Sequence, residues 1–317
     1  MTKLRAYAPA SIGNFAAGFD LMGAALAPLD GSLWGDVVTA ELAAAPSLTV
    51  AGTHAAHLPA APWDNLVLRT YALFGQALRE KGAECPAIAF HLEKGLPRSS
   101  GLGSSAASVA ATLAACQGLL GDPLSRNELY TVAGKAEGLF SGAAHLDNVV
   151  PALDGGVQLL VPGPGGTTEA RPLPWFDDLV LVVASPAFEL PTERSRQALP
   201  KSFTLAETVG FAQNLAAFVH ALESGDRALL RRCLRDPLAE PHRAPLVPGF
   251  RAAQAAALAD GALGCTLSGS GPAMFAVAPS VEQAGAIAKI LQSTLLDAGL
   301  ASEVRLCGLD HQGARIL

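Results

Sequence analysis

The sequence predicts an α+β fold built from two halves, and three observations favour it. The chain has 317 residues, of which 50% are hydrophobic and only 16% are charged, so it can bury a large core or two cores. Segments of strand type alternate with segments of helical spacing along the chain. A glycine-rich loop joins a strand to a helix, and no heptad pattern or internal repeat competes with this order.

The first half is expected to start with strands and to continue with helices. Short β-type runs precede longer segments whose apolar residues recur every three or four positions. Ser125 and Glu128 have the spacing of a capping box, which marks the start of the helix that carries Glu137. The strands are expected at residues 4–8, 36–42, 48–51 and 87–92, and the helices at residues 65–81, 104–117 and 126–137.

Glycine and proline mark the boundary between the halves. The run Pro162-Gly163-Pro164-Gly165-Gly166 is turn material, and we place the boundary there, with domains at residues 1–165 and 166–317. Strands and helices alternate beyond it, which favours a ferredoxin-like arrangement. The segment 240–250 is too rich in proline for a helix. The strands are expected at residues 179–184, on both sides of the glycine loop in 265–277, and at 304–309, with helices in 204–234 and from Ser280.

The composition argues against several classes of protein. The net charge of −6 includes no basic run, so neither nucleic-acid binding nor attachment to a membrane surface is expected. No apolar run is long enough to cross a bilayer, and no apolar signal core follows the N-terminus. The five cysteines are widely spaced and lack metal-ligand spacing, so we expect reduced thiols. These features predict a soluble cytoplasmic protein that captures an anionic substrate locally.

The segment 97–107 has the composition of a phosphate-binding loop. Its glycines let the backbone approach a ligand, and the helix that begins at Ser104 or Ser105 offers unpaired N–H groups and a positive dipole end. The serine hydroxyls can cap this helix, donate to a phosphate oxygen or bind magnesium. Anion binding is therefore expected here. The segment reads Pro97, Arg98, Ser99, Ser100, Gly101, Leu102, Gly103, Ser104, Ser105, Ala106 and Ala107.

Three other interpretations fit parts of this loop. A Walker A loop requires a Lys after its last Gly, whereas Ser104 follows Gly103. A dinucleotide-binding loop requires a closely preceding strand, and here a charged, proline-containing connection intervenes. No second strand ending in Asp or Glu follows about twenty residues later, as that loop also requires. For the loop taken alone, a plain Gly/Ser helix cap stays open.

Three further segments place polar residues among small ones. Residues 10–20 form a loop with Asn14 and Asp20 as its polar points, and residues 138–151 mix glycines with polar side chains. Residues 269–272 form a Gly-Ser-Gly-Pro loop. Taken alone, each segment fits a simple turn or a loop with Asx turns as well as it fits a ligand site.

Together, the four segments resemble the galactokinase, homoserine kinase, mevalonate kinase and phosphomevalonate kinase (GHMP kinase) family. In that family the pattern Pro-x-x-x-Gly-Leu-Gly-Ser-Ser-Ala wraps the triphosphate of ATP, and residues 97–106 match it except that Ser99 stands where Gly is usual. Other elements resemble the homoserine kinase branch in particular. These are Pro9-Ala10-Ser11, Asn14, Gly18-Phe19-Asp20, Gly23, the segment from Glu137 to Pro151, Thr192, Arg196, Glu240-Pro241, Arg243 and Pro248-Gly249-Phe250.

The resemblance implies a two-domain GHMP kinase fold, with an N-terminal half like domain 2 of ribosomal protein S5 and a ferredoxin-like C-terminal half. It implies ATP and Mg²⁺ as cofactors, with the metal bound by Ser105 and Glu137, whose oxygen ligands suit a hard cation. Asn65 is an expected contact of the nucleotide base or ribose. The implied activity is the ATP-dependent phosphorylation of the side-chain hydroxyl of L-homoserine.

A zwitterionic amino acid needs an acidic partner for its ammonium group and a guanidinium group for its carboxylate. Asp20 suits the first need, and Arg196 with Arg243 suits the second. For either arginine alone, a surface ion pair is the simpler interpretation. The substrate-binding residues expected from the resemblance are Asn14, Asp20, His145, Asn148, Thr192, Arg196, Arg243 and Gly269.

The catalytic residues expected from the resemblance are Glu137, Asp147 and Asn148. Asp147 corresponds to the Asp that is assigned as the base in mevalonate kinases, whereas in homoserine kinases the adjacent Asn is thought to face the hydroxyl. Because Asn cannot act as a base, we expect catalysis mainly by alignment and charge neutralisation.

Two further expectations concern partners and regulation. L-Threonine is a constitutional isomer of homoserine, so its ammonium and carboxylate groups should fit the same contacts and make it a competitor. The family precedent implies a homodimer. Two other functions stay open, namely a kinase of the same family that acts on mevalonate or a sugar, and a non-catalytic regulator that senses nucleotides.

Overall fold

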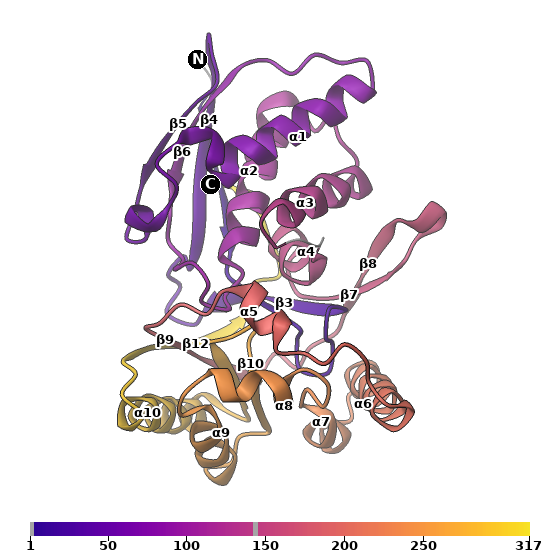
Figure 1. Ribbon diagram of the computed structural model, residues 1–317, viewed down its shortest axis with the longest axis vertical. Helices are drawn as coiled ribbons and strands as arrows, with labels where there is room; N and C mark the ends of the chain where they lie inside the picture. Colours follow the sequence, from indigo (N-terminus) through magenta and orange to yellow (C-terminus); the bar gives the residue numbers. More distant parts are fainter. Residues whose placement is uncertain (1–2, 142–144) are drawn as a thin grey trace.

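The computed structural model describes residues 3–141 and 145–317 of the chain. It has two β-sheets with helices packed against them (Figure 1). Met1 and Thr2 lie outside the described residues, and so do Gly142, Ala143 and Ala144 of the glycine-containing segment that follows Glu137. The predicted α+β fold class is confirmed.

A five-stranded sheet forms the upper part of Figure 1 and has the strand order β13-β1-β4-β6-β5. Only the β5–β6 pair is parallel. All four strands predicted in the first half lie in this sheet, which confirms them. The bounds are β1 Lys3–Pro9, β4 Gly35–Leu42, β5 Ser47–Ala51, β6 Ile88–Glu93 and β13 Arg315–Ile316.

The second sheet has eight strands in the order β10-β11-β9-β12-β3-β7-β8, with β2 paired to β3. Its side chains alternate between two apolar clusters, one on each face, so β9 is apolar at nearly every position. The strands predicted at 179–184, in 265–277 and at 304–309 are confirmed. The bounds are β2 Ser11–Gly13, β3 Met22–Pro28, β7 Val157–Pro162, β8 Thr168–Leu173, β9 Val180–Pro186, β10 Gly264–Leu267, β11 Met274–Ala278 and β12 Ser302–Leu309.

Both sheets join the two halves of the sequence. The N-terminal strand β3 pairs with the C-terminal strand β12, and the last strand, β13, returns to pair with β1. The proposed boundary falls in the turn η3, Pro164–Gly166, between the paired strands β7 and β8. The division into residues 1–165 and 166–317 therefore stays a prediction, and hydrogen-bonded strands run across it.

Helices α1 to α3 form a layer on one face of the five-stranded sheet, and α4 lies between α2 and the strands β2, β3 and β7 of the second sheet (Figure 1). Helix α2 lies at the centre of this layer and is buried almost all round, as its run of alanines allows. The predicted helices are confirmed, and two short 3₁₀ turns precede α1. The bounds are η1 Ala55–His57, η2 Pro62–Asp64, α1 Leu66–Glu80, α2 Ser104–Leu120, α3 Arg126–Ser141 and α4 Leu146–Asp154.

The remaining helices pack around the second sheet, with α9 and α10 on one face and α6 toward the other (Figure 1). Thr204 and Glu207 form the predicted capping box of α6, and Ser280 accepts a hydrogen bond from Gln283 at the start of α10. The bounds are α5 Thr192–Gln197, α6 Leu205–Ser224, α7 Arg227–Cys233, α8 Glu240–Arg243, η4 Ala244–Leu246, α9 Phe250–Ala259 and α10 Val281–Asp297.

The prediction that residues 240–250 contain no helix is wrong. The short helices α8 and η4 occupy most of this segment, and α9 begins at Phe250. Pro241 and Pro245 each stand in the first turn of their helix, where the backbone N–H that proline lacks would have no helical partner. Proline therefore starts these helices instead of preventing them.

The sequence did not predict the helix α4 or the strands β2, β3, β7 and β8. Pro151 inside α4 and the glycines before it weaken the helical pattern, and β3 is made largely of small residues with low strand propensity. Among the described residues, no helix combines the length and the apolar character needed to span a membrane.

Candidate functional site

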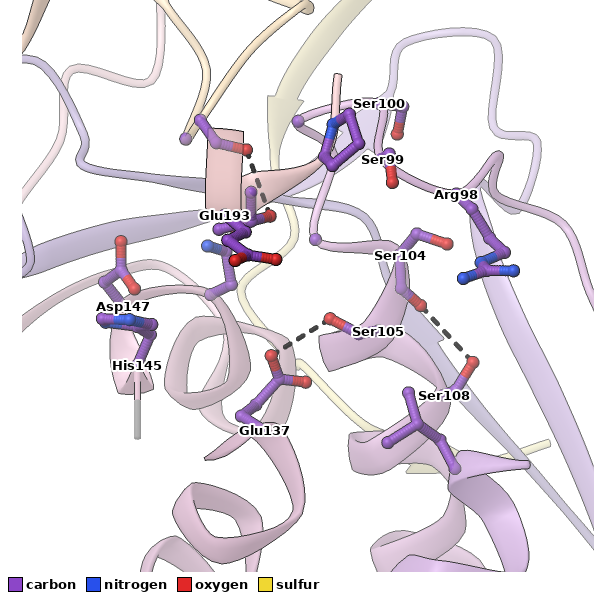
Figure 2. Close-up of a pocket in the computed structure, with 18 of the residues that line it drawn as sticks. Arg98, Ser99, Ser100, Ser104, Ser105, Ser108, Glu137, His145, Asp147 and Glu193 are labelled. Atoms are coloured by element: carbon purple, nitrogen blue, oxygen red, sulfur yellow. Dashed lines mark hydrogen bonds between the residues drawn. The ribbon is translucent and has the colours of Figure 1, made fainter. Parts of the chain in front are cut away.

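Segments that lie far apart in the sequence surround one cavity of about 330 Å³. The loop before α2, the end of α3 and the start of α4 contribute side chains to it, as Figure 2 shows. The opening loop, α5, α8, the loop between β10 and β11, the start of α1 with the segment before it, and the end of β6 also line it. The four polar segments of the sequence therefore meet at one site.

Helix α2 begins at the cavity with its first turn uncapped by any side chain. Its N-cap residue is Gly103, in the left-handed conformation with φ of 63°. The predicted serine cap is absent, because the hydroxyl of Ser104 donates to the carbonyl of Leu96 at 3.1 Å and that of Ser105 donates to Glu137 at 3.0 Å. The first-turn N–H groups and the positive end of the helix dipole are thus directed toward a ligand, which suits an anion.

Ser99 has a backbone conformation that explains why glycine is usual at this place in the loop. Its φ is 50°, in the left-handed region that disfavours residues with a Cβ atom. Its carbonyl accepts a hydrogen bond of 3.0 Å from the N–H of Leu190, which follows β9. The chain therefore keeps the glycine-like path with a serine, at a cost in backbone strain.

The carboxyl group of Glu137 faces the hydroxyl of Ser105 at the start of α2 (Figure 2). Burial raises the pKa of Glu137 to about 7, the hydrogen bond from Ser105 lowers it, and the charge of Asp147 raises it. A buried carboxylate beside a hydroxyl fits a hard divalent cation, which would compensate its charge. The described residues contain no group of three or more His, Cys, Asp or Glu suited to a metal ion.

The opening loop is held in a strained shape by Asn14. Asn14, Ala16 and Asp20 all have positive φ values, of 52°, 50° and 55°. The backbone N–H of Asn14 donates to Asp147 at 2.8 Å, and its side-chain NH₂ donates to the carbonyl of Gly269 at 3.0 Å. Its side-chain oxygen accepts from the N–H of Asp20 at 2.8 Å. Asn14 therefore connects the opening loop to α4 and to the glycine loop of the second half.

Asp147 and Asn148 lie in the first turn of α4 and approach the opening loop closely. The hydroxyl of Ser11 donates to the side-chain oxygen of Asn148 at 3.1 Å. A Cβ atom on Gly13 would lie 2.1 Å from the Asn148 amide nitrogen, so only glycine fits there. Burial, followed by the charge of Asp20, raises the pKa of Asp147 to about 6. Asp147 is nonetheless ionised above that pH.

Another part of the cavity wall gathers charged side chains from the opening loop, α5 and α8. One terminal nitrogen of Arg196 donates to both carboxylate oxygens of Asp20, at 2.8 and 2.9 Å, and lies 3.1 Å from His145 Nδ1. Arg243 is buried, donates to the carbonyl of Gly269 at 3.1 Å, and lies over the ring of Phe19. Burial lowers the pKa of His145, the charge of Asp20 opposes this shift, and the charges of Arg196 and Arg243 add to it.

Asn65 lies at another part of the cavity wall, where it caps α1. Its side-chain oxygen accepts from the N–H of Val67 at 3.0 Å. Its side-chain nitrogen is buried and has no hydrogen-bond partner within the part of the chain that the structure describes. A buried donor without a partner is costly, so this nitrogen is available for an acceptor on a ligand.

Comparison with known proteins gives matches over the whole chain. The family models for the GHMP kinases N terminal domain and the GHMP kinases C terminal match residues 65–156 and 218–297. The crystal structure of homoserine kinase from Cytophaga hutchinsonii is 33% identical over 100% of this chain and 98% of that one, with a TM-score of 0.90. The chain belongs to the GHMP kinase family.

This GHMP kinase is therefore a phosphotransferase, and kinases of its family use ATP, generally with Mg²⁺. Two less similar structures share the fold. A putative homoserine kinase from Listeria monocytogenes is 24% identical over 99% of both chains, with a TM-score of 0.71. The L. major mevalonate kinase, solved in complex with R-mevalonate, is 20% identical over 97% of this chain and 95% of that one, with a TM-score of 0.66.

The cavity of this GHMP kinase contains most of the residues expected from its sequence, with four exceptions. Leu102, Ala106 and Ala107 are buried in the apolar cores, and neither they nor Pro97 line the cavity. Their part in any site is limited to the backbone path and to packing. The expected residues that do line it are Asn14, Asp20, Asn65, Arg98, Ser99, Ser100, Gly101, Gly103, Ser104, Ser105, Glu137, His145, Asp147, Asn148, Thr192, Arg196, Arg243 and Gly269.

The wall of this kinase's cavity also contains residues that the sequence did not point to. Ser108 and Glu193 could have been suspected, since each lies within four residues of a predicted site residue. Lys94 directly follows Glu93 at the end of β6, and nothing in the sequence pointed to it as a site residue. The residues missed are Leu58, Pro59, Asp64, Leu66, Leu92, Lys94, Ser108, Pro191 and Glu193, whereas Ser270 lies in the predicted loop at residues 269–272.

Proposed function

We propose that this GHMP kinase transfers the γ-phosphoryl group of ATP to the side-chain hydroxyl of L-homoserine, forming O-phospho-L-homoserine for threonine biosynthesis. One observation carries the proposal: the wall of the cavity combines the carboxylate of Asp20 with the guanidinium groups of Arg196 and Arg243. A carboxylate and a guanidinium group are the partners that the two charges of an amino acid require.

The pairing of these groups suggests how the amino acid enters. Arg196 is bound to Asp20, so a substrate would exchange with this ion pair, its ammonium group taking Asp20 and its carboxylate taking the arginines. Within the described part of the chain, Nε of Arg196 and Nε2 of His145 are buried without a hydrogen-bond partner. A small polar ligand that supplies acceptors would remove that cost.

The part of the cavity wall at the start of α2 suits the triphosphate of ATP. The backbone amides at the start of α2 and the side chain of Arg98 supply positive charge there, and Ser105 with Glu137 would hold magnesium. When bound, magnesium neutralises charge on the terminal phosphates. The residues of the chain then serve to fix the acceptor hydroxyl in line with the transferred group.

Proton removal from the hydroxyl is assigned a minor role. Asp147 has a hydrogen bond from the backbone of Asn14, and Asn148 has one from Ser11, so both side chains are held in place beside the opening loop. We propose that they align the acceptor and that the proton leaves late, to phosphate or water. General-base help contributes only about 10²–10⁴-fold in such reactions.

A coupled assay of ADP release tests the function directly. We expect MgATP turnover with L-homoserine, and none above background with R-mevalonate, galactose or no acceptor.

The Asp20→Asn variant should raise KM for L-homoserine by about 10- to 100-fold, because a charged hydrogen-bond partner of the ammonium group is lost. Turnover with mevalonate or a sugar would assign another kinase activity of the family. Nucleotide binding without turnover on any acceptor would favour the non-catalytic regulator. The cytoplasmic location and the homodimer remain predictions.

A further inference from the structure

A buried ion pair lies beneath the phosphate loop and is not used in the proposed chemistry. Asp36 in β4 and Lys94, one residue after β6, have side chains that are 0% and 2% exposed, and the ammonium group donates to Oδ2 of Asp36. Two charges lose much solvation energy on burial, and apolar side chains of similar size are often as stable. The pair therefore calls for a reason other than stability.

The ammonium group of Lys94 also binds the start of α2. It donates to the backbone carbonyl of Ser104 at 2.7 Å and lies 3.1 Å from the hydroxyl oxygen of Ser108. The hydroxyl of Ser108 donates in turn to Oδ2 of Asp36 at 2.6 Å. The ammonium group thus donates to the carboxylate of Asp36 and to two oxygen atoms in the first two turns of α2.

The same carboxylate holds the other end of the phosphate loop. Oδ1 of Asp36 accepts hydrogen bonds from the N–H groups of Gly95 at 3.0 Å and Leu96 at 3.3 Å. The carbonyl of Leu96 accepts from the hydroxyl of Ser104 at 3.1 Å, which links the two ends of the loop directly. One buried carboxylate on β4 therefore fixes both the segment that leads into the loop and the helix that follows it.

We propose that Asp36 and Lys94 are positioning residues that hold the amides between residues 97 and 105 in the arrangement that receives the phosphates of the nucleotide. The loop between these anchors has three residues with positive φ, namely Ser99, Gly101 and Gly103, so its own conformational preferences do not fix it. Fixing both ends in advance lowers the ordering cost of binding. Because the pair is neutral overall, it acts through geometry more than through net charge. The inference rests on the proposed nucleotide site.

The test is the double variant Asp36→Leu/Lys94→Met, which replaces the ion pair by apolar side chains of similar size. Isothermal titration calorimetry with ADP and with adenosine, in the presence of Mg²⁺, separates phosphate binding from base binding. We expect the Kd for ADP to rise about 10- to 100-fold and the Kd for adenosine to stay within about twofold of wild type. KM for ATP should rise more than kcat falls. Urea unfolding should report a folded protein.

A milder pair of variants covers the case in which the double variant does not fold. Ser108→Ala removes the hydroxyl that bridges Asp36 and Lys94, and we expect it to raise the Kd for ADP about 3- to 10-fold. Thr112→Ala removes a buried hydroxyl one turn further along α2, where it donates to the carbonyl of Ser108 at 2.7 Å, and should leave that Kd unchanged.

Three results would contradict the inference. The first is a folded double variant that binds ADP with a Kd within twofold of wild type. The second is an equal Kd for ADP in Ser108→Ala and Thr112→Ala. Either result would overturn the inference and leave the proposed function standing. Failure of the wild-type protein to bind ADP would overturn the proposed function and this inference with it.

Discussion

Asp147 accepts a hydrogen bond from the backbone N–H of Asn14. Its charge interacts with those of Glu137 and Asp20, so it links the Ser105–Glu137 pair to the Asp20–Arg196 pair. If it only aligns the acceptor, Asp147→Asn should lower kcat by no more than about 10⁴-fold, since the amide keeps the size and the acceptor oxygen. Steady-state kinetics at saturating ATP measure this. A larger loss in a folded variant would identify Asp147 as the base.

The same variant should change the dependence of stability on pH. Burial, followed by the charge of Asp20, raises the pKa of Asp147 from 3.8 to about 6, so the folded state binds a proton that the unfolded state has already lost. The wild-type protein therefore loses stability as pH rises from 3.8 to about 6. At pH 8, Asp147→Asn should be more stable by on the order of 1–3 kcal/mol. Urea unfolding at pH 8 and pH 4 checks that the difference disappears at the lower pH.

Ser99 offers a second test at the scale of one residue. A side chain in the left-handed region costs about 1–2 kcal/mol, whereas glycine adds about 0.5–1 kcal/mol of chain entropy loss on folding. Ser99→Gly should therefore stabilise the protein by roughly 0.5 kcal/mol. Ser202→Gly is the control, because Ser202 is exposed and is not among the residues with positive φ. Urea midpoints that fall by the same amount in both variants would show that Ser99 is not strained.

A glycine in the left-handed conformation flanks each end of helix α2. Substituting each one separates the effect of backbone strain from the effect of displacing the loop before the helix. Gly103 has φ of 63°, and a Cβ atom there would lie 2.0 Å from the hydroxyl oxygen of Ser11. Gly121 has φ of 76°, and a Cβ atom there would meet nothing within 4 Å. We expect Gly121→Ala to lose about 1–2 kcal/mol of unfolding free energy from backbone strain, and Gly103→Ala to lose more, because its Cβ atom also overlaps the hydroxyl of Ser11.

Only Gly103→Ala should weaken ADP binding, by about tenfold or more, because the displaced loop no longer presents its amides. Calorimetric titration of both variants with ADP measures the difference. If Gly121→Ala lost as much affinity, the effect would come from strain in the helix as a whole and not from the loop.

The elements show where sequence patterns succeed and where they fail. Helix α1 and strand β9 follow from local periodicity and apolar content, because each buries a face or both faces against a core. Helix α4 contains Pro151 and β3 contains mainly small residues, so neither has a local pattern. Both are stabilised by their neighbours, since β3 pairs with β2, β7 and β12 and α4 packs against α2 and β3.

The fold of the whole molecule brings the charged part of the cavity wall together from both halves of the chain. Asn14 of the opening loop and Arg243 of α8 both donate to the carbonyl of Gly269.

Since L-threonine carries the same charged groups as homoserine, we expect it to compete with L-homoserine in steady-state kinetics. It should raise the apparent KM for L-homoserine without changing kcat. Inhibition that is noncompetitive toward homoserine would place threonine at a different site.

The sequence by itself determined the α+β class, most helices and central strands, and the loops whose residues face the cavity, because helix caps, periodicity and glycine-rich loops are local properties. Only the tertiary structure decided that Arg196 pairs with Asp20 and that Asp36 and Lys94 bind the two ends of the loop that precedes α2. These contacts join residues that are 176 and 58 positions apart in the chain. Their partners are set by strand order and helix packing, which no local pattern encodes.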